Sequence, residues 1–501
     1  MNKFLYKVGN AVDDLKSVIS PQSAMKSKAA RDAYFGYDAA KVTRRNPHMP
    51  TNAKSEVYGR RSRDRVMARA RDLERNSPVA CSLIFAVVNN VVRGGFNFQA
   101  ITENDRFNER IESLWKEWEH HENCDYTGQQ SLDDIIKMIV RRQLVDGGAL
   151  ITFPIDPQRD IPMTIQVHEA DELTDDGVIN LQNGNILLNG VELTKKGVPV
   201  AYWLKQVSPD GLEEYEPIKV DARDCICLWE RNRPSQYRGL SPMAPVIDLI
   251  DDLTDYNSAV TVQQKTAAYT SAFIETENLY NAPGRIANTP KGERVERLKP
   301  GTVVALNPGE HVKPFIPSGQ ANEAGEFIPI MQRMIAAAFG LSLESTSRNV
   351  ERVNYSSARQ NLLADEVTYR NVRGWLEEYF LRPLYRRFVN ICYLKGLLDG
   401  TGFKPNDPSY YKCEWLASTM GWIDPLKEAN ANTINLANGG KSFQQYCSEQ
   451  GVDWKDRILE MAEVQKFAEE NGVKLSYITE QQDTNDDWDY NGENENGKTG
   501  S

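Results

Sequence analysis

Apolar residues recur at helical spacing in several parts of this chain, and one of these runs is almost entirely apolar. The run SPVACSLIFAVVNNVV begins with Ser77 and Pro78, a capping residue followed by proline at the first helical position, and a Gly-Gly pair ends it. We expect a buried helix here, because few polar positions remain to face solvent. Weaker helical patterns predict further helices around residues 105–120 and 131–146.

Between residues 96 and 235, short apolar runs alternate with Asn-Gly, Asp-Gly and proline turns, which is the pattern of β-strands joined by tight connections. The runs are ALITFPI, MTIQVHEA, GNILLNGVEL, VPVAYWLKQV and DCICLWE. Together with the helices among them, these strands predict an α+β domain over residues 60–240, in a chain that is mainly helical elsewhere.

Two further helices bracket a Pro/Gly-rich segment. The first is predicted over residues 241–272 and the second over residues 326–342, with β structure expected between them, in residues 273–325. A loop rich in Ser, Arg and Asn follows in residues 343–353. It leads into a very long helix that begins near Asn354 and is bent or interrupted at Pro383.

The net charge of −11 is unevenly distributed. Residues 41–75 hold eleven Lys and Arg against four acids, whereas residues 446–501 hold fourteen acids against five bases. The basic stretch could contact nucleic-acid phosphates or an acidic partner, and the alternative is an ordinary solvated surface. The candidate contact residues are Arg60, Arg61, Arg63 and Arg65.

Length, cysteine content and hydropathy narrow the class of protein. The 501 residues suggest two to four domains, and seven scattered cysteines fit reduced thiols better than a disulfide framework. No apolar stretch approaches the length of a membrane span, and aspartates stand where a signal peptide would have its apolar segment. We therefore expect a protein made and kept in a cytosol, with no membrane partner.

The last residues, NGENENGKTGS, match the phosphate-binding loop of nucleotide hydrolases from Gly492 to Thr499. That loop needs a buried strand before it and a helix after it, and here an acidic polar stretch precedes it while two residues follow. Glu493 and Glu495 would also repel phosphate. We therefore interpret residues 481–501 as a disordered acidic tail.

Few residues suggest catalysis or metal binding. The cluster His120, His121 and Cys124 has a spacing that could place two zinc ligands on one helical turn, but no second pair of ligands is evident. Cys225 and Cys227 would share one face of a strand as buried thiols. His168 and His311 are isolated, and no nucleophile has a base beside it. The sequence therefore predicts no enzyme, no cofactor and no metal.

Four sequence blocks occur in a characteristic order: RGLSPMAPVI, LKPGTVVALNPGEHVKPF, NYSSARQNLL and GWIDPLKEAN. In this order and at these intervals they resemble the portal proteins of tailed bacteriophages in the lambda family, over roughly residues 60–475. The conjunction of four blocks is far more specific than any one of them.

The resemblance implies a portal-like fold with named regions. Those regions are an N-terminal arm, partly disordered (1–59); an α+β wing (60–240); two stem helices (241–272 and 326–342) around a clip (273–325); a tunnel loop (343–353); a long wing helix and return (354–440); a helical crown (441–480); and the tail (481–501).

It also implies a ring of identical subunits, commonly twelve, at one capsid vertex, through which double-stranded DNA passes without sequence specificity. The implied partners are the major capsid or scaffold protein, the terminase large subunit and the head-completion or adaptor proteins. The protein would belong to the virion, and to the host cytoplasm during assembly. The alternatives are another phage head or connector protein, or a P-loop packaging ATPase.

Within this scheme two sets of residues would face the DNA. In the first stem helix, Val246, Ile250, Leu253 and Val260 recur at helical spacing, and the remaining surface carries Asp248, Asp251, Asp252 and Asp255. Carboxylates lining a channel would repel phosphates and permit sliding, although a merely solvated face is the alternative. In the tunnel loop, Arg348, Asn349 and Arg352 would brace packaged DNA, unless the loop is only a connection.

Overall fold

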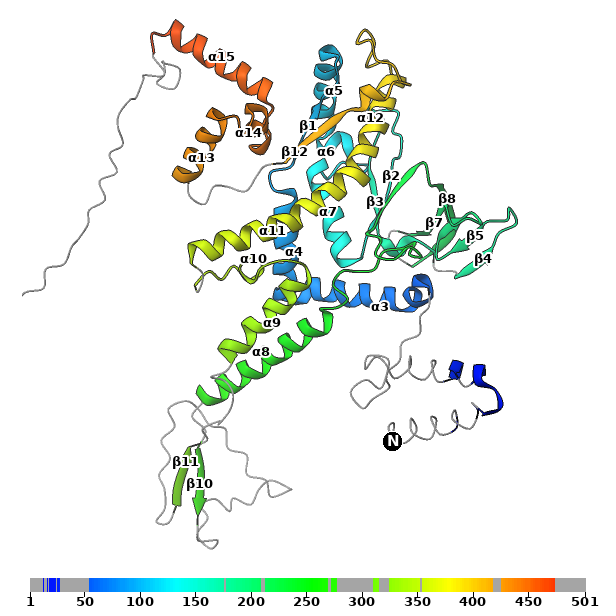
Figure 1. Ribbon diagram of the computed structural model, residues 1–501, viewed down its shortest axis with the longest axis vertical. Helices are drawn as coiled ribbons and strands as arrows, with labels where there is room; N and C mark the ends of the chain where they lie inside the picture. The colour runs from blue at the N-terminus through cyan, green and yellow to red at the C-terminus, as the bar shows by residue number, and fades with distance from the viewer. Residues whose placement is uncertain are drawn as a thin grey trace, which may run out of the picture. The chain divides into compact units, whose positions relative to one another are not determined.

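The computed structural model divides into two compact units, Met1–Tyr58 and Gly59–Ser501 (Figure 1). The expected N-terminal arm falls mostly outside the described residues, and the acidic tail falls wholly outside them, together with the phosphate-loop pattern at its end. The structure describes residues 12, 16, 18–23, 25–27, 54–174, 177–208, 212–268, 272–276, 310–314, 324–351, 354–417 and 425–473.

The apolar run after Ser77 forms the buried helix that its pattern predicts. Helix α3 (Ser55–Asn76) precedes it, and helix α4 (Pro78–Val92) begins where the Ser77 side chain accepts a hydrogen bond from the backbone of the first turn. After α4 the chain turns at Gly95, where φ is 98° and an added Cβ would lie 2.3 Å from a carboxylate oxygen of Asp133. Only glycine fits there.

Helices α5 (Asp105–Trp118) and α7 (Leu132–Val145) also form at the predicted places. Each begins at a side-chain cap, Asn104 for α5 and Ser131 for α7, because these side chains accept hydrogen bonds from backbone N–H groups of the first turn. Both helices turn an apolar face into the largest core of the chain, which they share with α4.

An aromatic cluster closes this core beneath strand β1 (Phe96–Ala100), which pairs antiparallel with strand β12 (Cys413–Ala417). Trp115 lies at its centre and is 1% exposed. Ring centroids of four neighbours lie within 5.1 Å of the Trp115 ring: Phe98, Trp118, Phe388 and Trp415.

Two antiparallel sheets form beside these helices. In the smaller one, β2 (Ala149–Thr152) lies between β3 (Gln166–His168) and β9 (Cys225–Leu228). The larger sheet has the strand order β4-β5-β6-β7-β8 and encloses a second, smaller core. The strands of the larger sheet are β4 (Val178–Asn180), β5 (Ile186–Leu188), β6 (Val191–Leu193), β7 (Pro199–Val207) and β8 (Glu214–Asp221).

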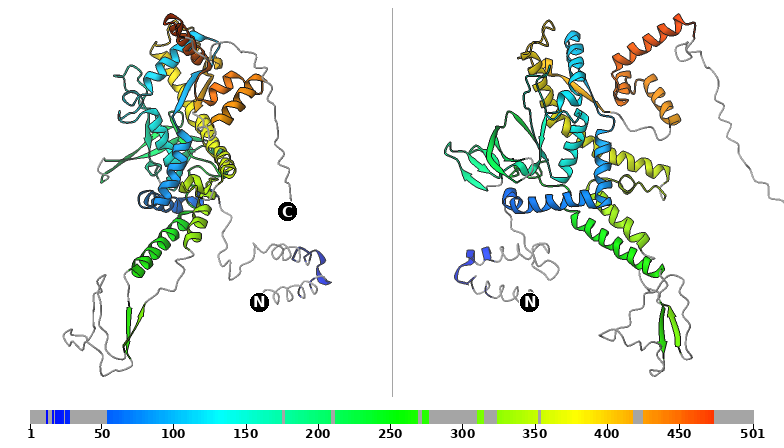
Figure 2. Two further views of the ribbon diagram at one scale, coloured as in Figure 1. Left: turned by 90° about the vertical axis from the view of Figure 1, so that its left-hand side faces the viewer. Right: turned by 180° about the vertical axis from the view of Figure 1, so that it is seen from behind.

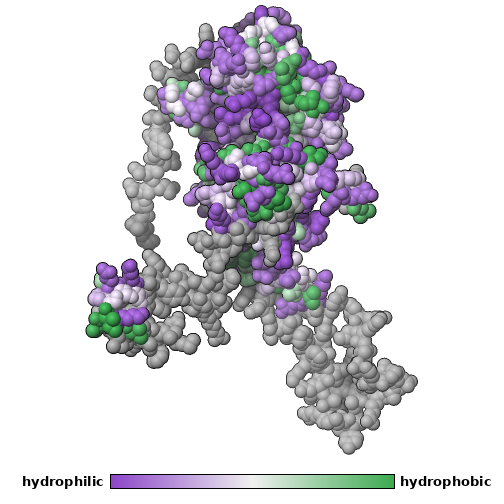
Figure 3. All heavy atoms as spheres, turned by 90° about the vertical axis from the view of Figure 1, so that its right-hand side faces the viewer, coloured by the Kyte–Doolittle hydropathy of each residue, from purple (hydrophilic) through white to green (hydrophobic). Residues whose placement is uncertain are grey.

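The face turned toward the viewer in Figure 3 is mostly hydrophilic where it is coloured, with small apolar patches.

The first of the four sequence blocks forms a tight backbone crossing between the sheets and the helices. A Cβ added at Gly239 would lie 1.9 Å from the carbonyl oxygen of Gly147, so two backbone segments touch here without side chains. The neighbouring Arg238 is 4% exposed and donates to the carbonyl oxygens of Ala170 and Asn189. The Arg-Gly pair of this block therefore has a packing role.

Helices α8 (Ile247–Ala268) and α9 (Ala324–Ala338) run side by side in every view (Figure 2). The rings of Tyr256 and Phe327 meet between them, 4.6 Å apart. Strands β10 (Ala272–Thr276) and β11 (Glu310–Pro314) pair antiparallel between the two helices in sequence. They belong to the segment that was predicted to be β.

The first of these helices begins later than expected, because residues 241–246 form turns rather than helix. Ser241 looks like a helix cap followed by proline, yet its hydroxyl donates to the carbonyl oxygen of Leu144 and accepts from the backbone N–H of Met243. The hydroxyl thus ties the turn to the end of α7. A tertiary contact has overridden the local capping signal.

The long helix begins near Asn354, as predicted, and its regular hydrogen bonding is interrupted close to the predicted break at Pro383. Asn354 caps α11 (Tyr355–Leu376) by accepting from a backbone N–H of the first turn. A π-helical turn (Glu377–Leu381) then joins α11 to α12 (Arg382–Leu394), so Pro383 lies at the start of a new helix, where its missing N–H does no harm.

Three more helices follow β12. They are α13 (Pro425–Ala437), α14 (Phe443–Glu449) and α15 (Trp454–Glu470). The amide of Asn97 on β1 donates to the carbonyl oxygen of Gly451, just before α15. Among the described residues, no helix is long and apolar enough to cross a membrane.

Candidate functional site

The four aspartates of α8 lie on one side of that helix, opposite Ile250 and Leu253, which are fully buried. Two of the aspartates are already paired within the chain. One terminal nitrogen of Arg69, on α3, lies 2.7 Å from Asp248 and 2.6 Å from Asp251. The hydrogen bonds to these two carboxylates raise the pKa of Arg69.

This pairing divides the predicted acidic face. Asp252 and Asp255 are exposed, and none of the ion pairs of the described residues involves them. A single arginine therefore offsets part of the negative charge at the start of α8. The negative charge of Asp252 and Asp255, in the next turn, is not offset in this way. Sequence periodicity found the face but could not find Arg69, because the pair joins positions 179 residues apart.

The arginines of the basic stretch are distributed between the interior and the surface. Arg63 is 4% exposed, and its Nε donates to the carbonyl oxygen of Gly239, so it is held inside the fold rather than presented to a phosphate. Arg65 is exposed. The side chains of Arg60 and Arg61 lie outside the described part of the chain.

A third arginine of this stretch joins a network of ion pairs. Arg71 donates to both carboxylate oxygens of Asp146, at 2.8 and 3.0 Å, and to Asp171. The Asp146 side chain is completely buried, and Arg142 also donates to it. Arg71 therefore holds α3 against the end of α7.

The predicted tunnel loop is partly helical. Its first residues form the short helix α10 (Leu343–Ser347), and Arg348 ends that helix with φ 55°, in the left-handed region. From Arg348 to Glu351 the described chain is exposed, and this part includes Asn349. Arg352 lies outside the described residues. The expectation of a loop over the whole segment was wrong for its first half.

A buried carboxylate anchors the base of this segment. Asp365, on α11, is 1% exposed and accepts hydrogen bonds from the backbone N–H of Ser342, at 2.7 Å, and from the hydroxyls of Ser342 and Ser345. Ser82 on α4 adds a hydrogen bond to the carbonyl oxygen of Thr346. The base of the segment is thus tied to α11 and α4, while its tip extends from them.

Sequence reasoning missed Asp365, although a signal was present. The residue stands in the buried stripe of α11 that Tyr369 and Leu376 continue, and an acidic residue in such a stripe requires hydrogen-bond donors. The donors come from Ser342 and Ser345, at the other end of a connection. Only the fold shows that these serines face Asp365.

The candidate metal and thiol residues have ordinary structural roles. Cys124 is buried next to backbone carbonyl oxygens, and burial raises the pKa of its thiol to about 12. His168 pairs with Thr152 and Glu172. In the described ranges, no three His, Cys, Asp or Glu residues are arranged to hold a metal ion. His311 is on β11, and its side chain is not described.

Comparison with known proteins gives related sequences. Residues 42–373 match the family described as phage portal protein, lambda family. The chain is 24% identical over 363 residues to a probable portal protein of Halomonas phage phiHAP-1, covering 70% of this chain and 69% of that protein. It is 22% identical over 442 residues to portal protein B of Escherichia phage lambda, covering 78% of this chain and 81% of that protein.

Solved structures with some similarity come from gene transfer agent particles. A chain from the neck of an empty particle is 15% identical with a TM-score of 0.44, covering 79% of this chain and 94% of that one. A chain from the neck of a native particle, computed with C12 symmetry, has a TM-score of 0.41. Because the family match spans well over half of the sequence, the chain belongs to the lambda family of phage portal proteins.

Proposed function

We propose that copies of this portal protein form a closed ring of twelve, the number common in the family, at one vertex of a phage capsid. DNA enters and leaves through the axis of the ring. The observation that carries this proposal, beside the family itself, is a set of apolar side chains on three helices that the described residues leave exposed. Portal proteins are structural components of the virion, and this role requires no reaction at a catalytic site.

The exposed apolar side chains lie on three helices. Residues on α8, α9 and α11 that would normally be buried are 40 to 62% exposed: Val262, Phe327, Ile330, Met334, Leu363 and Val367. Exposed apolar residues on several adjacent helices mark an interaction site. In a ring, each copy contacts the next through two different surfaces. Because the chain belongs to the portal family, we take a second copy of the same chain as the partner of this surface.

The regions of the ring follow from the same assignment. We place the wing in residues 60–240, with the long wing helix and return in residues 354–440, and the stem in α8 and α9. The β10–β11 pair belongs to the clip, residues 273–325. Residues 441–480 form the crown. The clip would meet the terminase large subunit and later the head-completion proteins, and the wing and crown would meet the capsid or scaffold protein during assembly in the host cytoplasm.

Asp252 and Asp255 are the stem carboxylates that we assign to the channel. No ion pair of the described residues involves them, whereas Asp248 and Asp251 share the single positive charge of Arg69. A ring would repeat two carboxylates in every copy and so surround the DNA with negative charge. Repulsion between carboxylates and phosphates favours sliding of the DNA. Walls lined with lysine would instead bind the phosphates tightly.

The tunnel loop supplies the weak contacts. Arg348, Asn349 and Arg352 would reach the DNA from a base that Asp365 holds in place. The loop also carries Glu344 and Glu351, so its net charge is zero and it could touch phosphates without a strong grip. We assign it the task of bracing packaged DNA against slipping back.

The ring is tested by placing charges on the uncovered surface. The double variant Ile330→Asp, Met334→Asp should remain folded and lose ring assembly, as measured by mass photometry and electron microscopy. Arg333→Gln, a substitution at an exposed polar position on the same helix, is the matched control and should form rings. Normal rings from the double variant, or a wild-type chain that stays monomeric at micromolar concentration, would contradict the proposal.

The bracing role is tested separately. We expect particles carrying Arg348→Glu and Arg352→Glu together to assemble normal rings but to retain less DNA late in packaging, because the loop carries little of the core. Arg359→Glu, at an exposed position on α11, is the control for added negative charge. Packaged-genome retention equal to wild type in the loop variant would leave the loop as a connection only.

A further inference from the structure

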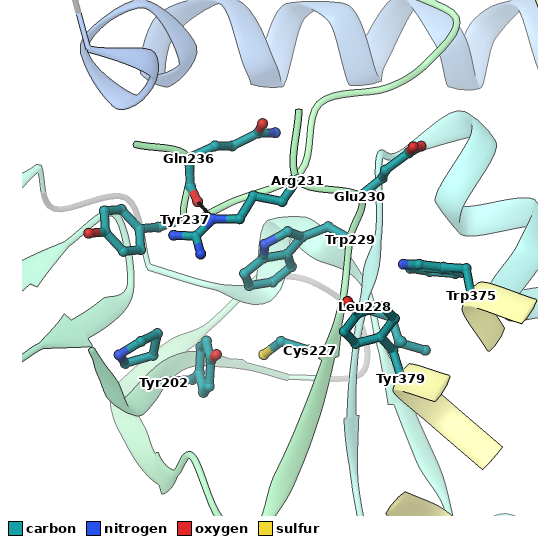
Figure 4. Close-up of a pocket in the computed structure, with 11 residues that line it drawn as sticks. Tyr202, Cys227, Leu228, Trp229, Glu230, Arg231, Gln236, Tyr237, Trp375 and Tyr379 are labelled. Carbon is teal, nitrogen blue, oxygen red and sulfur yellow. Dashed lines mark hydrogen bonds between the residues drawn. The ribbon is translucent and has the colours of Figure 1, made fainter. Parts of the chain in front are cut away.

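A pocket of about 440 Å³ lies in the wing, where the chain leaving β9 faces the π-helical turn after α11 (Figure 4). No role assigned above uses this pocket. It is open to solvent and lies between the smaller core of the sheets and the larger core of the helices. Its lining consists of Pro199, Tyr202, Cys227, Leu228, Trp229, Glu230, Arg231, Gln236, Tyr237, Trp375 and Tyr379.

The walls of the pocket are largely aromatic. Figure 4 shows Trp375 and Tyr379 on one side and Tyr202 and Tyr237 on the other. The Trp229 ring meets the Tyr202 ring edge-on, with centroids 6.2 Å apart. Tyr379 is 58% exposed although it lies beside this cluster. Aromatic walls with open edges provide large contact area at low conformational cost, which suits them to hold another aromatic side chain.

The π-helical turn helps to form one wall. Glu377–Leu381 interrupts the regular hydrogen bonding between α11 and α12, and Trp375 and Tyr379 lie just before it and within it. Their ring centroids are 6.4 Å apart. Single π-helical turns are rare and frequent at functional sites. The end of α11 and the π-helical turn thus each present one aromatic ring to the pocket.

Arg231 lines the pocket and has hydrogen-bond donors that the described residues do not use. The Nε of Arg231 donates to the carbonyl oxygen of Gln236, at 3.0 Å, and its guanidinium carbon lies 5.5 Å from the centre of the Tyr237 ring. Among the described residues, its two terminal nitrogens have no partner. A guanidinium held in this way can donate to a carboxylate. The pocket therefore fits an aromatic side chain with a carboxylate beside it.

The chain itself contains such a segment. Trp488 and Tyr490 are the only aromatic residues after Tyr477, and they stand among acids in the stretch Asp-Asp-Trp-Asp-Tyr. Residues 474–501 carry seven acids and two bases, so their charge complements Arg231. The described chain ends at Val473, and the 15 residues from there to Trp488 can span at most about 50 Å when extended.

We propose that the acidic C-terminal segment of this protein docks into the aromatic pocket of the wing, with Trp488 or Tyr490 between the aromatic walls and a neighbouring aspartate on Arg231. The aromatic contacts provide the anchor, and the charge pair fixes the direction of the segment. This assignment does not depend on ring formation. It gives the C-terminal segment a role in binding protein, whereas the phosphate-loop pattern would have given it a role in binding nucleotide.

A labelled peptide with the sequence of residues 481–495 is the probe. It should bind the chain ending at residue 480 at least tenfold more tightly than a scrambled peptide of the same composition. The full-length chain should bind the peptide at least fivefold more weakly than the shortened one, since its own tail competes at high effective concentration. Fluorescence anisotropy measures both, and matching unfolding curves show that the deletion leaves the fold intact.

Substitutions of pocket residues test whether the peptide binds in this pocket. Arg231→Gln and Tyr379→Ala in the shortened chain should each weaken peptide binding at least fivefold. Arg223→Gln removes an arginine that is 90% exposed on the same wing and does not line the pocket, so it should bind as before. Binding no better than that of the scrambled peptide, or unchanged in both pocket variants, overturns the proposal.

A photo-crosslink tests the full-length protein without disturbing the pocket. With p-benzoylphenylalanine in place of Trp488, crosslinks should map by mass spectrometry to residues 199–237 or 375–379. The same photo-reactive residue in place of Lys498 is the control and should give at most a minor share of such crosslinks. Trp488 crosslinks that fall mainly elsewhere in the protein count against the proposed site.

Discussion

Around Trp115 the apolar side chains of α5, α12 and β12 close on one another, whereas on α9 comparable side chains remain open to water. Trp115 is 1% exposed and Met334 is 51% exposed, although both belong to amphipathic helices of the same chain. The first region folds by burying its own apolar surface, and the second leaves apolar side chains exposed, where we propose that a second copy binds. Stability and assembly should therefore respond to different mutations.

The largest effect on stability should come from the aromatic cluster. Trp115→Ala removes a side chain that four other rings enclose, and large-to-small changes at such sites cost about 4 kcal/mol of unfolding free energy. Chemical denaturation of the isolated protein measures the loss. Phe85→Ala, at a position 47% exposed on α4, should cost about 1 kcal/mol or less. Equal losses would erase the distinction between the two regions.

The buried ion pair at α7 should give the next largest effect. Asp146→Ala removes the buried acceptor that Arg71 and Arg142 share, although these arginines keep Asp171 and Glu74 as partners, so the loss should be about 2 kcal/mol, below that of a buried pair broken completely. Asp134→Ala removes an exposed carboxylate that pairs with Lys137, and it should cost about 0.5 kcal/mol. If the two variants unfold at the same denaturant concentration, the network contributes nothing to the fold.

A carboxyl group near the core should make stability depend on pH. Burial raises the pKa of Glu112 to about 7, and Asp453 and Asp456 add to that effect. A raised carboxyl pKa stabilises the protein fully below the unfolded pKa, about 4.5, and the contribution is lost as pH rises through about 7. Glu112→Gln should therefore remove this loss.

The expected gain from Glu112→Gln is about 1 kcal/mol at pH 8, discounted for the partial exposure of the group. At pH 4 the variant and wild type should be equally stable. Urea unfolding at both pH values measures the difference, and Glu109→Gln, an exposed neighbour on α5, should show none. A variant that is less stable than wild type at pH 8 would show that the ionised form of Glu112 is favoured in the fold.

The smallest effect on unfolding should come from α9. The pair Ile330→Asp, Met334→Asp exchanges exposed apolar groups for charges, so the unfolding free energy of the monomer should change by no more than about 0.5 kcal/mol. Denaturation at a protein concentration too low for assembly isolates this quantity. A loss comparable to that of Trp115→Ala would place these side chains in the core of a single chain.

Local sequence signals located many element boundaries and failed where a distant contact competed. The cap at Ser77 and the start of the long helix near Asn354 were predicted, because a helix start depends mainly on its own first turn. The helix predicted from residue 241 begins only at Ile247, since the Ser241 hydroxyl donates to the end of α7. The short helix α10 was missed because its supports come from α4 and α11.

The candidate site was predicted in part for the same reason. The spacing of Asp248 to Asp255 is local, so the acidic face of α8 could be read directly. Arg69, which pairs with two of these four carboxylates, lies 179 residues from Asp248. The basic stretch was similarly recognised by its charge, but nothing in its composition separates the buried Arg63 from the exposed Arg65.

The sequence by itself determined the family, the α+β character of residues 60–240, the positions of most helices and the charge of each segment. These properties depend on periodicity, on caps and on the conjunction of short motifs, all of which are local in the chain. The tertiary structure alone decided which arginines form ion pairs, which carboxylate anchors the segment that begins at Leu343, and which aromatic rings line the pocket beside the π-helical turn. Each of these is a contact between side chains far apart in sequence, and its free energy exists only once the backbone brings the two partners together.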